Sequence, residues 1–409
     1  MTMFDELPPF ELAFPGPLRD QLVAAVLSGA KTSTTGLVRE YELAGDPLPE
    51  VGERSAVIDS AGQPVAVIEV TEVRVVPLGE VDEAHARDEG EGHETVAAWR
   101  ADHEGFWHSP QMRQALGDPH FTVDDGTPVV ACRFMVVECG RAPVENGELY
   151  YEAAGSGPVL VLLHGGMLDM GMWDEQFTRL ARSGRRVIRY DARGHGRSSV
   201  SDGDWCDHDD LYALLDRLRV VRATLVGHSS GARIAVDTAI AHPGVVAGLV
   251  LLAPGLSGSE ITDPYIQEHL QGQEKCFGAP DGAERFVEHY LRMWVDGPYR
   301  EPEAVDPVLR ERIWATATAN VTANVATPTL GRAIEAQAVE RLHEIQVPTV
   351  ALIGELDSGD VAGNLADIVS VVPGARAVVV PGAGHLVSLE GRASFEQSLD
   401  AFLRAHPWV

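Results

Sequence analysis

Apolar and polar positions follow two different patterns along the chain, and the pattern changes near residue 140. In the first part, short strand-like runs are mixed with stretches in which apolar residues recur every three or four positions, the spacing of a helix face. The expected strands lie at residues 55–58, 65–76 and 128–137, and the expected helices at residues 17–28 and 81–101. This mixture predicts a small α+β unit over residues 1–140.

A second, more regular pattern begins after residue 148. Continuous apolar runs alternate with helical stretches, which is typical of a mostly parallel sheet covered on both faces by helices. Strands are expected at residues 159–163, 186–190, 224–226, 248–252, 349–353 and 377–380, and helices at residues 172–183, 209–218, 230–242 and 393–405. Residues 255–346 interrupt the alternation with helical patterns alone. Between the two parts, Pro143 and Gly147 are breaker residues, so we expect a linker at residues 141–148.

Length, cysteine content and the N-terminus place limits on the class of protein. A chain of 409 residues exceeds the size that one hydrophobic core usually serves, so two domains are expected. The four cysteines form no Cys-x-x-Cys pair and no zinc-type spacing, which predicts reduced thiols and no metal site. The N-terminus lacks a basic signal segment, and no apolar run approaches the ~20 residues that cross a bilayer. We therefore expect a soluble cytoplasmic protein without a membrane partner.

One sequence motif organises the second part. Gly227-His228-Ser229-Ser230-Gly231 follows the apolar run 223–226 and precedes a helical pattern. In this context Gly-x-Ser-x-Gly predicts a nucleophile elbow, a sharp strand-to-helix turn that exposes the serine hydroxyl. The serine adopts strained backbone angles there, so both neighbouring positions need the small size of glycine.

Other polar segments also follow predicted strands, at the sheet edge where open α/β sheets bind ligands. They are His164–Met167, Asp191–Ser198, Gly354–Asp357 and Gly382–His385. With the elbow, they give the chain order Ser229, Asp357, His385, which is the order of α/β-hydrolases. Residues 145–409 resemble that superfamily, and are most similar to its esterase, enol-lactonase and cofactor-free haloperoxidase group.

The resemblance implies a doubly wound α/β-hydrolase domain at residues 149–409, with a helical cap at about 255–346. Ser229 would attack a carbonyl carbon, His385 would take its proton, and Asp357 would orient the imidazole, with Asp360 as a rival acid. The oxyanion hole would use the backbone N–H groups of Ser230 and Gly166, with Met167 as an alternative. Met167, Trp173 and Trp294 are candidates for the substrate pocket, and helix packing is the alternative for Trp173.

The expected substrate is a small carboxylic ester or lactone, and no cofactor is expected. A perhydrolase would use the same three residues. A receptor that is acylated without turnover is a further alternative.

Residues 10–140 carry several separated motifs of another family. They are Gly-x-Lys-Thr-x-Thr at 29–34, Leu-Pro-x-x-Gly at 48–52, Ala-x-x-Glu-Gly-Glu-Gly at 86–92 and Trp-Arg-x-x-His at 99–103. In this order they resemble the ASCH family, a small PUA-like β-barrel. The resemblance implies a second site formed by Lys31, Thr34 and Glu89, as in amidohydrolases that cleave acetylated cytidine. A surface ion pair between Lys31 and Glu89 is the alternative.

The acidic charge of the first domain limits the classes of ligand that it can bind. The chain has a net charge of −29, and residues 1–140 contain 25 acidic and only 9 basic side chains. Affinity for RNA or DNA strands rests largely on neutralising phosphates with lysine and arginine. ASCH domains are also proposed RNA binders, but this balance suits a nucleoside-sized ligand better than a strand. An ASCH nucleoside amidohydrolase or RNA-related module, with the hydrolase domain as accessory, is the alternative to the esterase or lactonase prediction.

Overall fold

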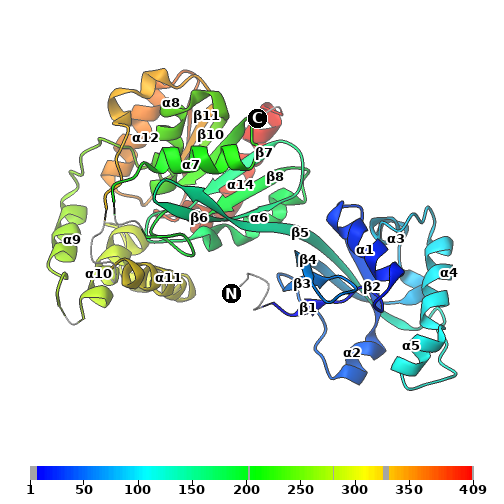
Figure 1. The fold of residues 1–409 in the computed structure, drawn as a ribbon. Coiled ribbons are helices and arrows are strands. Elements are labelled where there is room, and N and C mark those ends of the chain that lie inside the picture. The colour runs from blue at the N-terminus through cyan, green and yellow to red at the C-terminus, as the bar shows by residue number, and fades with distance from the viewer. Residues whose placement is uncertain (1–6, 201–202, 280, 326–330, 408–409) are drawn as a thin grey trace. The chain divides into compact units, whose positions relative to one another are not determined.

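The computed structural model describes residues 7–200, 203–279, 281–325 and 331–407 and divides the chain into two compact units. Unit 1 comprises Met1–Glu138 and unit 2 comprises Cys139–Val409. Figure 1 shows unit 1 in blue and cyan and unit 2 from green to red. Within the described residues, no helix is long and apolar enough to cross a membrane.

Unit 1 is built on a mixed sheet flanked by short helices. Its strands are β1 (Pro9–Phe10), β2 (Ser33–Leu37), β3 (Arg54–Ile58), β4 (Pro64–Pro77) and the first part of β5 (Pro128–Val144), and its helices are α1 (Pro17–Leu27), α2 (Val38–Ala44), η1 (Leu78–Glu80), α3 (Glu83–Asp88), α4 (Val96–Trp107) and α5 (Pro110–Ala115). The strand order is β1-β3-β4-β5, and β2 pairs with β5 as well. All pairs are antiparallel except β1 with β3.

The helix expected at residues 81–101 is broken into α3 and α4. The cause lies in the glycines between them, because Gly90 and Gly92 have positive φ angles of 66° and 89°. A Cβ atom at Gly90 would lie 2.3 Å from the carbonyl oxygen of Ala30. Only glycine fits this close approach, and the break brings Glu89 and Glu91 beside Lys31.

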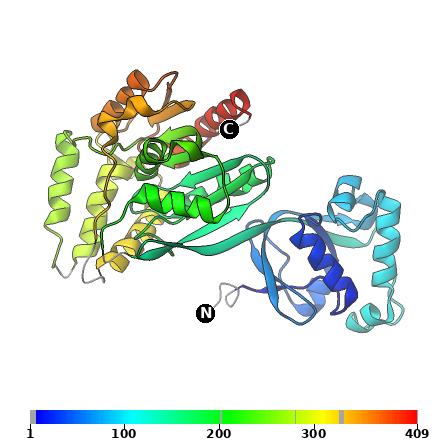
Figure 2. The same cartoon turned by 45° about the horizontal axis from the view of Figure 1, so that its top comes forward.

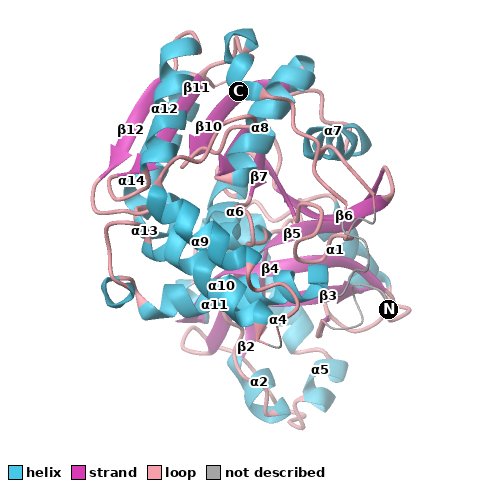
Figure 3. Cartoon of the chain, turned by 90° about the vertical axis from the view of Figure 1, so that its left-hand side faces the viewer, coloured by secondary structure: helices cyan, strands magenta, loops and turns pink. Residues whose placement is uncertain are grey.

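Unit 2 is a mostly parallel sheet with helices on both faces (Figures 1 and 3). Its strands are β6 (Gly147–Ala154), β7 (Val159–Leu163), β8 (Arg186–Tyr190), β9 (Ala223–His228), β10 (Val246–Leu252), β11 (Thr349–Gly354) and β12 (Arg376–Val380), in the order β6-β8-β7-β9-β10-β11-β12. Only β6 is antiparallel to its neighbour β8. Every residue of β9, β10 and β11 is buried, as expected for strands covered on both faces.

The helices of unit 2 fall into a group that covers the sheet and a group that forms the cap. The covering helices are η2 (Met170–Trp173), α6 (Asp174–Ala181), α7 (Asp207–Arg217), α8 (Ser230–Ala241), η3 (Pro243–Val245), η6 (Ala338–Glu340), η7 (Leu342–Glu344), α12 (Gly359–Val371), α13 (Val387–Glu390) and α14 (Arg392–Ala405). The cap contains α9 (Pro264–Glu274), α10 (Gly282–Leu291), the π-helix η4 (Arg292–Asp296), η5 (Pro302–Ala304) and α11 (Pro307–Val325). In two views, α9, α10 and α11 lie together at one side of the sheet of unit 2 (Figures 1 and 2).

The linker expected at residues 141–148 is a β-hairpin instead. Strand β5 continues to Val144, and β6 begins at Gly147 and pairs with it. The two residues between them form the turn, in which Asn146 has a positive φ angle of 57°. Pro143 and Gly147 are typical of a break in secondary structure, but asparagine also tolerates the left-handed conformation that a tight hairpin turn requires, as Asn146 does here.

Candidate active site

Ser229 lies at the turn between strand β9 and helix α8. Its φ and ψ angles are 53° and −112°, a conformation that L-residues rarely adopt. Its backbone N–H donates to the carbonyl of Leu252 at 2.9 Å, which ties the turn to the neighbouring strand β10. A Cβ at Gly227 or Gly231 would lie 2.3 Å from the carbonyl oxygens of Gly231 and Leu163, respectively. Both glycines are therefore required by the packing of the turn.

Asp357 and His385 reach Ser229 from two neighbouring strands. Gly354, the last residue of β11, is paired with Val380, the last residue of β12, so the loops after both strands begin at the same level. Nε2 of His385 lies 2.9 Å from Oγ of Ser229, and Nδ1 lies 3.0 and 3.1 Å from the two carboxylate oxygens of Asp357.

The carboxylate of Asp357 also accepts the backbone N–H of Ser358 at 2.8 Å. Asp360, the rival acid, accepts hydrogen bonds from Thr262 and Asp263 instead. The arrangement thus forms a continuous relay from the Ser229 hydroxyl through His385 to Asp357. Such a relay can remove a proton from the hydroxyl as it attacks an electrophile.

A second histidine supports the backbone of the first. His228 lies in the elbow motif, and its Nε2 donates to the carbonyl oxygen of His385 at 2.8 Å. Burial and the nearby His385 lower the pKa of His228 to about 3, so its imidazole is neutral at pH 7. Sequence reasoning assigned no role to this residue, because the middle positions of Gly-x-Ser-x-Gly vary and carry no information about distant contacts.

The loop after β7 places Gly166 beside Ser230, the residue that follows Ser229. Among the hydrogen bonds of the described residues, none uses the backbone N–H of Gly166 or that of Ser230. The backbone N–H of Met167, by contrast, donates to Nε2 of His195 at 3.2 Å. Gly166 and Ser230 also lie close together, since a Cβ at Gly166 would be 3.1 Å from Oγ of Ser230. The backbone N–H groups of Gly166 and Ser230 are therefore available to an anionic oxygen. The backbone N–H of Met167 is not, because it already donates to His195.

The two candidate tryptophans occupy different environments. The Trp294 ring, on the π-helix η4, lies 4.7 Å from the His385 ring, centroid to centroid. Trp173 is completely buried, and its ring packs against Phe395 of α14. Trp294 thus borders His385, while the position of Trp173 supports its helix-packing alternative.

Unit 1 contains a separate cluster of buried polar residues around Glu89. The Lys31 ammonium lies 2.9 Å from a carboxylate oxygen of Glu89 and 2.7 Å from one of Glu91. Trp99 Nε1 donates to Glu89 at 3.0 Å. The expected ion pair between Lys31 and Glu89 is therefore present, but it is not on the surface, because each side chain is only 1% exposed.

The threonine in this cluster is Thr35 and not the expected Thr34. Thr35 donates its hydroxyl to Glu89 at 2.7 Å, and Ser33 donates to the carbonyl of His85 at 3.0 Å. Side chains alternate between the two faces of a strand, so residues 33 and 35 of β2 share one face and Thr34 points to the other. The motif spacing alone selected Thr34, because the strand register was not visible in the sequence.

Electrostatics keep the carboxylate of Glu89 charged. Burial alone would raise its pKa, but the Lys31 ammonium and hydrogen bonds from His103 and His85 outweigh this effect and hold the pKa well below the usual value. Burial opposes protonation of His103, yet its contacts with Glu89 and Glu91 raise the pKa of that histidine. The cluster therefore combines a cation and an anion within one buried site, with a hydroxyl beside them.

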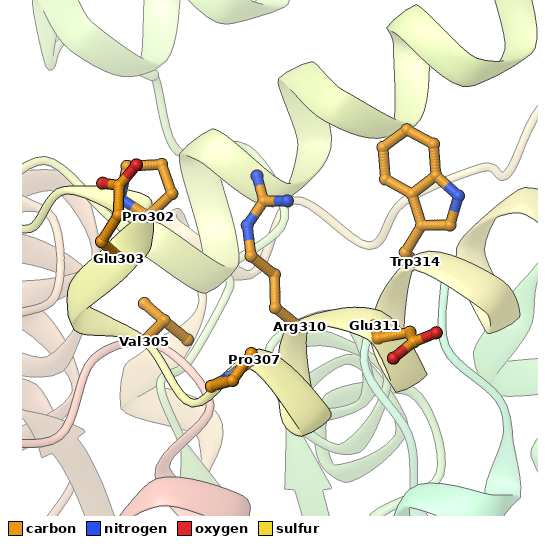
Figure 4. A pocket seen from close by; sticks show the side chains of 7 residues that line it. All are labelled: Pro302, Glu303, Val305, Pro307, Arg310, Glu311 and Trp314. Carbon is orange, nitrogen blue, oxygen red and sulfur yellow. The ribbon is translucent and has the colours of Figure 1, made fainter.

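Two further features of the described residues lie outside these two clusters. A cavity of about 510 Å³ in the cap is lined by Pro302, Glu303, Val305, Pro307, Arg310, Glu311 and Trp314 (Figure 4). This lining includes neither Ser229 nor His385. Ligand atoms of Cys206, His208 and Asp209 lie within 4.8 Å of one another, but the Asp209 carboxylate already bonds to Nε2 of His242 at 2.7 Å. We assign no metal to this group.

Comparisons with known proteins agree with this architecture. A profile of the alpha/beta hydrolase family matches residues 160–397, more than half of the chain, and a profile of the ASCH domain matches residues 11–138. A relative from Pseudomonas putida, the dihydrolipoyllysine-residue acetyltransferase component of the acetoin cleaving system, is 29% identical over 63% of this chain. The match spans 66% of that protein, just under two thirds of its length.

The solved structures that are similar to this chain include esterases and lactonases. Est816, described as an N-acyl homoserine lactone degrading enzyme, is 26% identical with a TM-score of 0.51, covering 64% of this chain and 100% of that one. The enol-lactonase from Burkholderia xenovorans LB400 is 25% identical with a TM-score of 0.52, covering 65% of this chain and 100% of that one. The fold, the strand-end geometry and these matches together show that the chain is an enzyme of the alpha/beta hydrolase family, preceded by an ASCH domain.

Proposed function

We propose that unit 2 hydrolyses a small carboxylic ester or lactone through a Ser229 acyl-enzyme. The observation that carries this proposal is the relay of short contacts from Ser229 through His385 to Asp357. A serine hydroxyl is a weak nucleophile near pH 7, and it needs a base in contact with it and a group that orients the base.

The reaction follows from the geometry. Oγ of Ser229 forms a bond to the carbonyl carbon while its proton passes to Nε2 of His385, and the carbonyl oxygen becomes an oxyanion. The N–H groups of Gly166 and Ser230 stabilise that charge, and a donor of this kind is typically worth about 3 kcal/mol in the transition state. His385 then gives its proton to the leaving alkoxide, and the ester bond breaks. Water, activated by the same histidine, releases the acid and restores Ser229.

The similar proteins favour acyl transfer from small molecules. Est816 and the Burkholderia enol-lactonase are described as acting on lactones, and a carboxylesterase from Bacillus subtilis has the same fold. In this chain, Trp294 covers His385 from the cap. An aromatic ring in this place suits an apolar acyl or alcohol group, because it excludes water from the reacting atoms.

Labelling with a fluorophosphonate tests the proposal. The wild-type protein is expected to gain the mass of one adduct, and Ser229→Ala to gain none, because only an activated serine displaces fluoride from phosphorus at a useful rate. Intact-mass spectrometry measures both. Ser370→Ala, at an exposed position of α12, is the matched control and should label like the wild type. A folded wild type without an adduct, or an adduct that survives in Ser229→Ala, would show that the proposal is wrong.

A second candidate function belongs to unit 1. We infer that the cluster of Lys31, Thr35 and Glu89 processes a nucleoside-sized ligand such as an acetylated cytidine. The observation in its favour is that a buried lysine and a threonine hydroxyl each donate a hydrogen bond to the carboxylate of Glu89, at 2.9 and 2.7 Å. This is the residue set that the ASCH resemblance implies, with Thr35 in place of Thr34.

Two neighbouring threonines provide the test of this candidate. If unit 1 is an amidohydrolase, the wild type should release cytidine from N4-acetylcytidine, and Thr35→Val should lower the rate about 100-fold, because the hydroxyl beside the charged pair is lost. Thr34→Val removes the same group from the opposite face of β2 and should retain activity. Chromatographic detection of cytidine measures the rates. Absence of cytidine with the wild type, or equal losses in both variants, would exclude this activity.

A further inference from the structure

The cap makes direct hydrogen bonds to the loop that carries the Gly166 N–H group. From α10, the Tyr290 hydroxyl donates to the carbonyl oxygen of Gly166 at 2.7 Å. From α11, the Asn320 side-chain amide donates to the carbonyl oxygens of Met167 and Leu168 at 3.1 and 3.0 Å. Three consecutive carbonyl groups of one loop are therefore held by two side chains of the cap.

These contacts fix the orientation of one peptide group. The peptide between Gly166 and Met167 is held at both ends, since its oxygen accepts from Tyr290 and its N–H donates to His195. Burial lowers the pKa of His195 to about 4, so the imidazole is neutral at pH 7 and can accept this hydrogen bond. Met167 has a positive φ angle of 59°. Such a conformation is rare for a residue with a side chain and persists only where its surroundings enforce it.

Tyr290 is well suited to hold this loop. Its side chain is buried, and burial raises its pKa further above the usual value, so the hydroxyl keeps its proton for donation. Helix α10 continues directly into η4, which carries Trp294 against the His385 ring. One continuous segment of the cap therefore contacts both the loop of Gly166 and the histidine.

We propose that Tyr290 is a positioning residue for the oxyanion hole. The Gly166 N–H belongs to the preceding peptide, whose carbonyl on Gly165 accepts from Nδ1 of His164 at 2.8 Å and from the Leu168 N–H at 3.2 Å. By holding the next carbonyl, that of Gly166, the Tyr290 hydroxyl fixes the other side of Gly166 and so keeps its N–H directed to the oxygen that becomes charged. The inference rests on the proposed function of Ser229, and it gives the cap a part in the chemical step in addition to covering the substrate. Loss of the Tyr290 hydroxyl lets the Gly166–Met167 peptide rotate and so weakens stabilisation of the oxyanion. The pocket that binds the substrate stays intact.

Removal of single hydroxyl groups from the cap tests this inference. Tyr290→Phe is expected to lower kcat for p-nitrophenyl butyrate about tenfold, less than the 100-fold or more that follows loss of an oxyanion donor itself. KM should stay within about twofold, since ground-state contacts do not change. Tyr265→Phe is the matched control, because Tyr265 also donates its hydroxyl to a backbone carbonyl of the cap, that of Arg292 at 3.0 Å. This control should retain the wild-type kcat.

Inhibitor binding separates positioning from a general effect on the pocket. An alkyl trifluoromethyl ketone forms a bond to the serine oxygen and leaves an oxyanion, whereas the corresponding methyl ketone binds largely without one. The inhibition constant of the trifluoromethyl ketone should rise about tenfold in Tyr290→Phe, and that of the methyl ketone should not change.

Unchanged kinetics in folded Tyr290→Phe, or equal weakening of both ketones, would overturn the inference. Thermal unfolding checks the fold of each variant, and if Tyr290→Phe does not fold, Asn320→Ser tests the same loop through its other two carbonyl groups. Failure of the proposed function is distinct, because the wild type itself would then not react with the fluorophosphonate.

Discussion

Replacing His385 by glutamine is expected to lower kcat for p-nitrophenyl butyrate by about 10⁵-fold, because the residues of such a relay act as one unit. Glutamine can still accept a hydrogen bond from the Ser229 hydroxyl, but it cannot take up the proton at neutral pH. The remaining rate would come from the oxyanion hole and substrate binding alone. Steady-state kinetics with purified protein, free of contaminating esterase, measures the effect.

The double variant makes this prediction specific. Addition of Ser229→Ala to His385→Gln should lower the rate no further, since the hydroxyl is inactive without its base. His406→Gln is a suitable control, because His406 lies just after α14, where its Nδ1 donates to the carbonyl of Phe402 at 2.9 Å, and its replacement should leave kcat unchanged. If the two substitutions at Ser229 and His385 had independent, additive effects, the two residues would not act through one proton transfer.

The second large effect is expected for Asp357→Asn, with a loss of about 10⁴-fold in kcat at pH 7. The carboxylate accepts a hydrogen bond from Nδ1–H of His385, which keeps the proton on Nδ1 and leaves Nε2 unprotonated toward Ser229. An asparagine amide can present an N–H group to Nδ1 instead, which favours the tautomer that cannot act as a base. The protein should still fold, because the side chain keeps its volume. A pH–rate profile of the variant against the wild type measures the loss.

Asp360→Asn provides the comparison for Asp357. The Asp360 carboxylate accepts two backbone N–H groups, of Thr262 and Asp263, and the Thr262 hydroxyl. It lies only three residues further along the chain, yet its replacement should change kcat less than twofold. A large loss in Asp360→Asn together with full activity in Asp357→Asn would exchange the roles of the two acids.

The sheet and the serine relay could be predicted because they depend on local and periodic signals. Fully apolar runs such as 159–163 and 248–252 indicated buried parallel strands, and polar residues directly after such runs indicated the edge where side chains converge. The order of Ser229, Asp357 and His385 then followed from the positions of the strands. The helical content of the cap was also visible, since no strand-like run interrupts it.

Other features depended on contacts between distant segments, which no single stretch of sequence reveals. Thr34 and Thr35 are indistinguishable by composition, and only the register of β2 against β5 decides which of them shares a face with Ser33. Tyr290 is one aromatic residue among several in the cap, and its contact with Gly166 joins residues 124 positions apart. The hairpin at residues 141–148 was not expected, because Pro143 and Gly147 are also typical of a break between domains.

That hairpin affects how the protein can be divided into fragments. The boundary between the units, after Glu138, lies inside strand β5 and not in a loop. A fragment that starts at residue 149 would lose the strand paired with β6 and leave Tyr150 and Tyr151 on an uncovered sheet edge. Unpaired edges of this kind promote association between chains. Cloning of the hydrolase part should therefore begin at or before Cys139, so that the recombinant fragment keeps its outermost strand.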